Sequence, residues 1–232
     1  MYRRQFKNKS IFIISDCFVP RQNSGSGMIY NLAKSFQEEN ANVLCIHGGK
    51  DPKKNIKIFK DYQIDEIEFI TSDMFEFLRN KNLISRFFFE ILLSIFLALK
   101  VLLNVKKSRN CHLIIWYGPS VFLWMPTLLL KMITGAPVYY VLRDIFPDWL
   151  ISVGLIKNKI LIKFLQIISF PQFSVPSKIG VEAPENLDII KEKKGKCQKL
   201  EVLYNWPSLD ISNQSKNKID DTSEFVKHKN YL

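Results

Sequence analysis

The first fifty residues contain a strand, a glycine-rich turn, a helix and a second strand in close succession. Ser10–Ser15 is a short apolar run rich in β-branched residues, which is typical of a buried parallel strand. Apolar residues at helical spacing follow the turn, and Val43–His47 supplies the next strand. Because this order is that of a βαβ unit, we predict an α/β fold: a Rossmann-like, mostly parallel sheet flanked by helices.

Further strands and helices alternate along the rest of the chain. The predicted strands are Ile67–Thr71, Leu113–Tyr117, Val138–Leu142, Phe173–Val175 and Leu200–Tyr204, and the predicted helices include Val121–Thr134, ended by Gly135, and Leu161–Ile168. Beyond Pro207 the composition changes to Ser, Asn, Lys and Asp. We therefore expect one domain over residues 1–207 and a polar linker or tail over 208–232.

The chain is basic, with 33 Lys and Arg against 22 Asp and Glu and a net charge of +11. This balance predicts an anionic partner such as lipid headgroups or a phosphorylated substrate. Nucleic acid is not expected, because no recognition motif accompanies the charge. Four cysteines without paired spacing and the lack of a secretory signal predict a cytoplasmic protein. The three histidines share no metal-ligand spacing, so neither a metal nor a cofactor is expected.

Ile84–Val105 is the most apolar segment of the chain. Glu90 and Lys100 interrupt it too often for a membrane span, which needs about 20 apolar residues. Its apolar side chains exceed what one buried helical face requires, and basic residues cluster at its ends. We predict an interfacial helix that contacts an anionic membrane surface through Phe87, Phe88, Ile95, Phe96 and Leu99. The alternative is a helix packed wholly against the sheet.

The turn after the first strand ends in Gly25 and Gly27, immediately before the first helix. Free backbone N–H groups in such a loop can bind a phosphate or a polar hydroxyl. A dinucleotide fingerprint would place a glycine at Tyr30, and a P-loop would place a lysine at Met28. A dehydrogenase and a P-loop enzyme are therefore not predicted, and a plain tight turn is the alternative.

Charged and aromatic residues follow the predicted strand Val138–Leu142, at the end where a parallel sheet places its ligands. Trp149 is a candidate for stacking on a sugar ring. Arg21, Arg143 and Lys178 are candidates for binding an acceptor diphosphate, because cationic side chains suit phosphate; on so basic a chain, solvated cations are the alternative.

Four segments in order resemble family 4 glycosyltransferases of the GT-B fold. Ser15–Pro20 with Gly25 and Gly27 resembles the opening strand and loop of that family. The bacterial fucosamine-transferase-like branch of O-antigen and capsule synthesis has segments similar to Val141–Asp148 with Gly154 and Leu155, Ile179–Val181 with Pro184, Asn186 and Leu187, and Val202–Pro207.

The resemblance implies two Rossmann-like domains facing a cleft, of which the first binds the acceptor and the second the nucleotide-sugar donor. We expect this chain to be the acceptor domain alone, with the donor domain absent or carried by a separate chain, and to be inactive by itself. The implied reaction is retaining transfer onto a polyprenyl-diphosphate-linked saccharide, at the inner face of the plasma membrane. A non-catalytic membrane-anchoring subunit that recruits a separate catalytic half is the alternative.

The resemblance also implies roles for particular residues. Gly25 and Gly27 would let the backbone approach the donor diphosphate. Asp144 would contact the transferring sugar or the acceptor hydroxyl, with Asp148 as a nearby substitute. The alternative for Asp144 is a charge partner of Arg143 or a helix N-cap.

Overall fold

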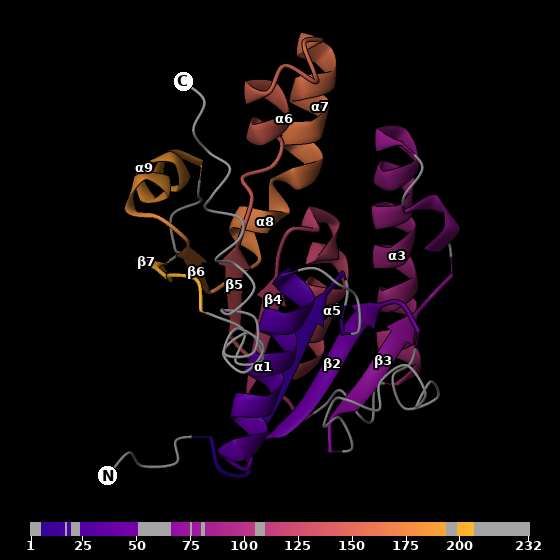
Figure 1. The fold of residues 1–232 in the computed structure, drawn as a ribbon, viewed down its shortest axis with the longest axis vertical. Helices are drawn as coiled ribbons and strands as arrows, with labels where there is room; N and C mark the ends of the chain where they lie inside the picture. Colours follow the sequence, from indigo (N-terminus) through magenta and orange to yellow (C-terminus); the bar gives the residue numbers. More distant parts are fainter. Residues whose placement is uncertain are drawn as a thin grey trace, which may run out of the picture.

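A seven-stranded, wholly parallel sheet forms the centre of the molecule, with helices on both of its faces (Figure 1). The computed structural model describes residues 6–16, 18–19, 24–50, 66–74, 76–79, 82–104, 110–193 and 199–206. The strands are β1 (Ser10–Ser15), β2 (Asn42–Gly48), β3 (Glu68–Ser72), β4 (Leu113–Tyr117), β5 (Val138–Leu142), β6 (Lys178–Val181) and β7 (Lys199–Val202), in the spatial order β3-β2-β1-β4-β5-β6-β7. The predicted Rossmann-like α/β fold is confirmed.

The helices lie between the strands along the chain. They are α1 (Ser24–Glu38), the 3₁₀ turns η2 (Glu76–Leu78) and η3 (Val121–Leu123), α3 (Leu83–Leu103), α5 (Trp124–Thr134), α6 (Asp148–Ser152), α7 (Lys159–Ser169), α8 (Pro171–Ser174) and α9 (Pro184–Lys193). Gly135 ends α5 in the left-handed conformation, at a φ of 67°, as the sequence predicts.

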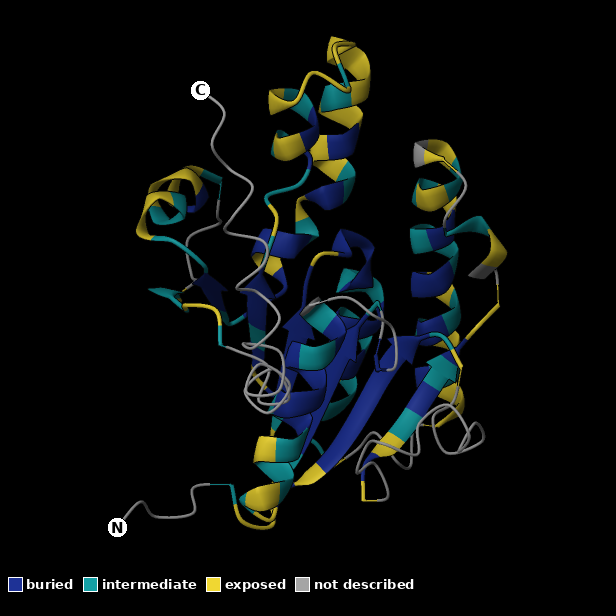
Figure 2. Cartoon of the chain, viewed as in Figure 1, coloured by how far each residue is buried: buried dark blue, intermediate teal, exposed yellow. Residues whose placement is uncertain are grey.

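Alternate residues of β1 supply two separate hydrophobic cores. Ile11 and Ile13 pack with Ile29 and Ala33 of α1 on one face of the sheet. Phe12 and Ile14 pack on the other face, in a cluster that contains residues of both α3 and α5. Because both faces are covered, the central strands are buried along almost their whole length, as Figure 2 shows.

The predicted strand Phe173–Val175 is wrong. Residues 171–174 form the short helix α8, in which the Val175 N–H donates to Pro171 O at 2.9 Å, and the strand comes later, as β6. Phe and Val favour strands, but Pro171 stands at the first position of a helix, where its missing N–H is not needed. Phe173 is still buried in the core. The last strand also begins and ends earlier than Leu200–Tyr204.

The first helix begins before the position that the sequence predicts. Ser24 already opens α1, so Gly25 and Gly27 lie in its first turn and not in the preceding loop. Backbone N–H groups in a first helical turn have no partner within the helix, so these positions still present hydrogen-bond donors. Pro207 and the predicted tail over 208–232 lie outside the described residues.

Helix α3 spans Leu83–Leu103 and has two apolar sides. Phe89, Leu93, Leu97 and Val101 repeat every fourth residue and are fully buried against the sheet. The opposite side carries exposed apolar residues, which include Phe88 at 54% and Leu99 at 48% exposure. The helix therefore packs against the sheet and also presents an apolar face to the outside. Within the described residues, no helix is long and apolar enough to cross a membrane.

Candidate functional site

The strand order changes direction between β1 and β4, which are neighbours at the centre of the sheet. The chain leaves β1 into α1 on one face and leaves β4 into α5 on the other face. In open parallel sheets, the two diverging connections form a crevice at the carboxyl ends of the strands, and ligands bind there. We refer to this end of β1, β4 and β5 as the carboxyl edge.

Asp16 directly follows β1 at this edge and is paired with Arg79. Arg79 Nη1 lies 3.5 Å from Asp16 Oδ2, and the second guanidinium nitrogen of Arg79 donates to the Asp16 backbone carbonyl. The side chains are only 14% and 10% exposed, and the guanidinium also lies 4.6 Å from the centre of the Phe89 ring. Through Arg79, Asp16 is thereby held against Phe89 of α3.

Glu90 is a second carboxylate at the same edge, and it projects from α3. Ser120 Oγ donates to Glu90 Oε2 at 3.2 Å, and Arg86 Nε donates to Oε1 at 3.1 Å. Burial raises the pKa of Glu90 to about 7, while Arg86 lowers it in part and the carboxylate of Asp16 raises it further. Glu90 therefore gains or loses a proton near neutral pH.

Tyr140 of β5 is buried below the carboxyl edge, and its hydroxyl interacts electrostatically with carboxylates of that edge. Its ring stacks on that of Trp116, with centroids 4.0 Å apart. Burial raises the pKa of the Tyr140 hydroxyl, and the charges of Asp144 and Glu90 raise it further. A Cβ at Gly118, just after β4, would lie 3.5 Å from this hydroxyl, in ordinary van der Waals contact. The phenol is therefore neutral, and the carboxylates of Asp144 and Glu90 both act on it electrostatically.

Asp144 is exposed just beyond the end of β5, and its neighbour Arg143 is held in place. Arg143 pairs with Glu182 after β6 and donates to Asn205 after β7. Asp144 has no hydrogen bond or ion pair within the described parts of the chain, and α6 is preceded by Pro147 without a side-chain cap. Neither structural alternative for Asp144 is therefore found there, and its carboxylate remains available to a ligand.

Asn205 and Trp206 bring the end of the described chain back to this edge. The Trp206 indole N–H donates to Met28 O at 3.2 Å, and its ring lies 6.3 Å from that of Tyr117. Together with the Arg143 contact, this fixes the segment after β7 beside α1.

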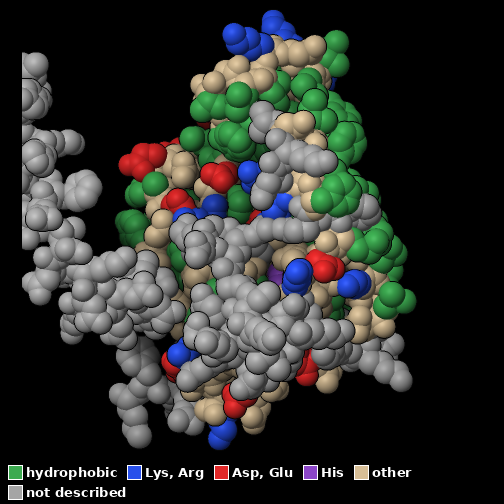
Figure 3. All heavy atoms as spheres, turned by 45° about the vertical axis from the view of Figure 1, so that its right-hand side comes forward, with side chains coloured by type: hydrophobic (Ala, Val, Ile, Leu, Met, Phe, Trp, Pro, Cys, Tyr) green, Lys and Arg blue, Asp and Glu red, His purple; other side chains and the backbone are tan. Residues whose placement is uncertain are grey.

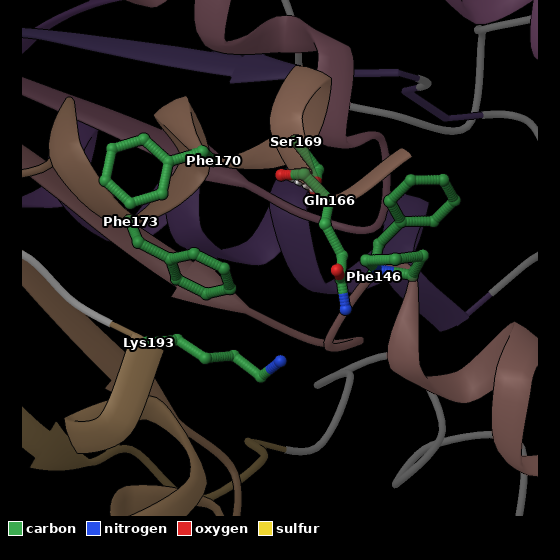
Figure 4. Close-up of a pocket in the computed structure, with 7 residues that line it drawn as sticks. Phe146, Gln166, Ser169, Phe170, Phe173 and Lys193 are labelled. Atoms are coloured by element: carbon green, nitrogen blue, oxygen red, sulfur yellow. Dashed lines mark hydrogen bonds between the residues drawn. The ribbon is translucent and has the colours of Figure 1, made fainter. Parts of the chain in front are cut away.

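Asp148 and Trp149 lie on α6, next to Phe146 and Pro147, which line a cavity. Asp148 pairs with Lys193 of α9, with its Oδ2 2.8 Å from Nζ. The cavity has a volume of about 180 Å³, and aromatic rings and the Lys193 chain surround it (Figure 4). Its lining residues are Phe146, Pro147, Gln166, Ser169, Phe170, Phe173 and Lys193. Because Asp148 is neutralised by Lys193, Asp144 is the better candidate for binding a substrate hydroxyl.

The structure brings some predicted site residues together and separates others. The first turn of α1, with Gly25 and Gly27, lies at the carboxyl edge, because it follows β1 directly. Lys178 begins β6, at the other end of the strands, and pairs with Glu201 at 2.5 Å. It is therefore separated from Asp144. Arg21 lies outside the described residues.

The predicted membrane-contact residues are divided between two environments on α3. Phe88, Ile95 and Leu99 are exposed, whereas Phe87 and Phe96 are half-buried. The Phe87 ring lies 5.3 Å from that of Phe122, edge to face. Three of the five side chains are thus free to contact a surface.

Sequence reasoning missed Glu90, Ser120 and Tyr140 as site residues. Tyr140 and Ser120 carry no local signal, because a buried strand and a turn explain each of them equally well. Glu90 does carry a local sequence signal, because a single acid within a very apolar helix must be either paired or functional. Among the described residues, no group of three His, Cys, Asp or Glu side chains is placed to hold a metal ion.

Comparison with known proteins finds likeness in structure and none in sequence. No protein-family profile and no curated protein sequence matches the chain. Its fold is similar to UDP-glucose:anthocyanidin 3-O-glucosyltransferase in complex with UDP, at a TM-score of 0.56 and 13% identity, covering 89% of this chain and 55% of that one. It is similar also to TcCGT1 in complex with UDP, at a TM-score of 0.50 and 10% identity, covering 90% and 55%.

The chain thus spans about half the length of the solved structures that it matches. Its sheet is a single Rossmann-like unit of the kind found in GT-B glycosyltransferases. At these identities the likeness concerns the fold alone.

Proposed function

We propose that this chain is the acceptor-binding half of a glycosyltransferase that uses a nucleotide-sugar donor. The supporting observation is the placement of Asp144 and the first turn of α1 at the carboxyl edge of a sheet whose fold is that of glycosyltransferases. A carboxylate there can accept a hydrogen bond from a sugar or acceptor hydroxyl, and helix N–H groups can face a diphosphate. A second Rossmann-like domain, in the same or another chain, binds the donor.

The acceptor in this proposal is a polyprenyl-diphosphate-linked saccharide at the inner face of the bacterial plasma membrane, in retaining transfer for surface-polysaccharide synthesis. The exposed apolar face of α3 supports it, with Phe88, Ile95 and Leu99 outward. So does the net charge of +11, because both a lipid-linked diphosphate and the membrane surface are anionic. The acceptor lipid would stay in the bilayer while its head reaches the carboxyl edge.

A non-catalytic anchoring role is a second candidate, and the same exposed face of α3 favours it. The two candidates differ at the carboxyl edge. An anchor has no need of Asp144, whereas an acceptor half binds its ligand beside it.

Ligand binding to the purified chain tests the proposal. Titration calorimetry with farnesyl diphosphate, a short prenyl diphosphate, should show binding, whereas UDP should bind far more weakly because its site lies in the donor domain. Binding of UDP alone would contradict the acceptor assignment, and binding of neither ligand would favour the anchor. Transfer of sugar from UDP-glucose by this chain alone would contradict the half-enzyme proposal.

A further inference from the structure

Helices α6 and α7 form a hairpin that projects beyond the sheet (Figure 1). Its outer surface is unusually apolar for a segment exposed to water. The exposed apolar residues are Trp149, Val153, Leu155, Ile160, Leu161, Phe164, Ile167 and Phe170. Ile160 is 82% exposed and Ile167 64%, so these side chains have hardly any protein neighbours to pack against. A contiguous patch of this kind indicates a contact surface.

Three exposed apolar residues of α7 form a stripe along the helix. Ile160, Phe164 and Ile167 are spaced by four and three residues and therefore lie on one face. Leu165 and Ser169 lie on the opposite face and are buried. The helix is thus anchored to the domain on one side and presents an apolar stripe on the other.

The charge beside the stripe is basic. From Trp149 to Ser177 the chain has three lysines and no acidic residue, and Asp148 at the start of α6 is paired with Lys193. Lys159 and Lys163 lie one turn apart, beside the stripe, and Lys157 lies in the connection before α7. Figure 3 shows hydrophobic side chains covering the upper part of the molecule, with basic side chains at its tip. An apolar stripe bordered by lysines complements an anionic lipid surface.

A protein partner fits this surface less well. The centres of protein interfaces are depleted of lysine, and a protein partner would need acidic side chains opposite the lysines of this surface. A membrane span is also excluded for α7 itself, because its 11 residues extend only about 16 Å, against a hydrocarbon core of about 30 Å. A helix of this length with this pattern lies flat in the interfacial region.

We infer that the α6–α7 hairpin inserts its apolar stripe into the interface of an anionic bilayer, as a lipid contact separate from that of α3. The inference rests on the membrane association within the proposed function, but it assigns that association to a different element. The hairpin projects beyond the carboxyl edge, and α3 runs alongside the sheet up to it. The lipid contacts of the hairpin and of α3 together would turn this edge toward the lipid headgroups.

Flotation of the full chain with vesicles tests the inference. The vesicles contain either phosphatidylcholine alone or equal parts of phosphatidylcholine and phosphatidylglycerol. The triple variant Ile160→Ser, Phe164→Ser, Ile167→Ser should lower binding to the mixed vesicles at least tenfold, because three exposed apolar side chains no longer enter the interface. The control is Met132→Ser with Ile189→Ser, which removes exposed apolar groups from α5 and α9 and should bind as the wild type does.

The charge is tested separately with Lys159→Gln and Lys163→Gln. Each should weaken binding to the mixed vesicles by roughly fivefold and leave binding to phosphatidylcholine unchanged, because only the attraction to anionic lipid is lost. The thermal melting temperature of every variant should equal that of the wild type, since the substituted side chains are exposed.

Three outcomes would overturn the inference. One is wild-type binding by the triple variant, and another is loss of binding only on substitution of Phe88 and Leu99 in α3. The third is a change in oligomeric state by the triple variant without a change in flotation, which would assign the stripe to a second copy of the chain. None of these bears on the farnesyl diphosphate titration, so the proposed function is tested independently.

Discussion

Ser120 Oγ donates a hydrogen bond to Glu90 Oε2 at 3.2 Å and thereby joins the loop after β4 to the middle of α3. The contact places a carboxylate at the point where the connections of β1 and β4 diverge. Arg86 binds the other carboxylate oxygen from the solvent side, and Asp16 acts on it from the loop after β1. Burial at this contact raises the pKa of Glu90 to about 7, so this carboxylate titrates near neutral pH.

Stability should depend on pH through Glu90. Its pKa is raised in the folded chain, so the folded state holds this proton more tightly than the unfolded state does. The contribution of Glu90 to the free energy of unfolding should be largest below about pH 4.5 and should fall as the pH rises to about 7. This contribution falls by about 3 kcal/mol in total, because a pKa difference of one corresponds to roughly 1.4 kcal/mol.

The variant Glu90→Gln removes this titration while keeping an acceptor for Ser120. Urea unfolding at pH 5 and pH 8 should show a smaller difference in the variant than in the wild type, with the variant gaining most at pH 8. The same pH dependence in both proteins would contradict the role of Glu90. Asp188→Asn, an exposed acid on α9, serves as the control.

The two sides of α3 should respond differently to truncation. Leu93→Ala removes a fully buried side chain and should lower the free energy of unfolding by about 2 to 5 kcal/mol, because a cavity remains in the core. Leu99→Ala should change it by no more than about 0.5 kcal/mol, since Leu99 is 48% exposed. Chemical denaturation of both variants checks this, and equal losses would mean that α3 does not pack as described.

Gly48 should not tolerate a side chain. A Cβ at this position would lie 2.6 Å from the Asp16 carbonyl oxygen and 2.8 Å from Leu93 Cδ2. Gly48→Ala should therefore displace the loop after β1 and lower the melting temperature, at a cost of about 1 to 3 kcal/mol. Ser35→Ala, on the exposed side of α1, is the control and should melt as the wild type does. An unchanged melting temperature for Gly48→Ala would show that the loop adjusts freely.

Asp144 and Asp148 should differ in an enzyme that contains both halves. Asp144→Asn should lower the rate of sugar transfer by about a hundredfold or more, as expected for a group that acts on the reacting hydroxyl. Asp148→Asn should leave the rate within a few-fold, because its carboxylate is already paired with Lys193. Steady-state transfer assays compare the two. Equal effects, or a larger effect at Asp148, would reject Asp144 as the chemical group.

The central strands were predictable because burial on both faces gives an unbroken apolar run, as in Phe12 to Ile14. Strand β6, which lies between β5 and the edge strand β7, gives no such run. It has four residues, begins with Lys178 and contains Gly180, where a Cβ would meet the Tyr139 hydroxyl and Leu203. That glycine serves a close approach between distant segments, which local propensity does not record.

The candidate site was predictable only where its residues follow a strand. Asp144 could be assigned to the carboxyl edge because it comes two residues after β5. Glu90 could not, because its place depends on how α3 crosses the sheet and on Ser120, which reaches it from another loop. The exposed stripe of α7 was hidden for a similar reason: its helical spacing is visible in the sequence, but whether another element covers it depends on tertiary packing.

The indole of Trp206, hydrogen-bonded to Met28 O, has a mechanical consequence. It fixes the point at which the described chain leaves the sheet, beside the first turns of α1. In the proposed two-domain enzyme, the connection to the donor-binding domain would therefore start next to the helix whose N-terminus faces the diphosphate.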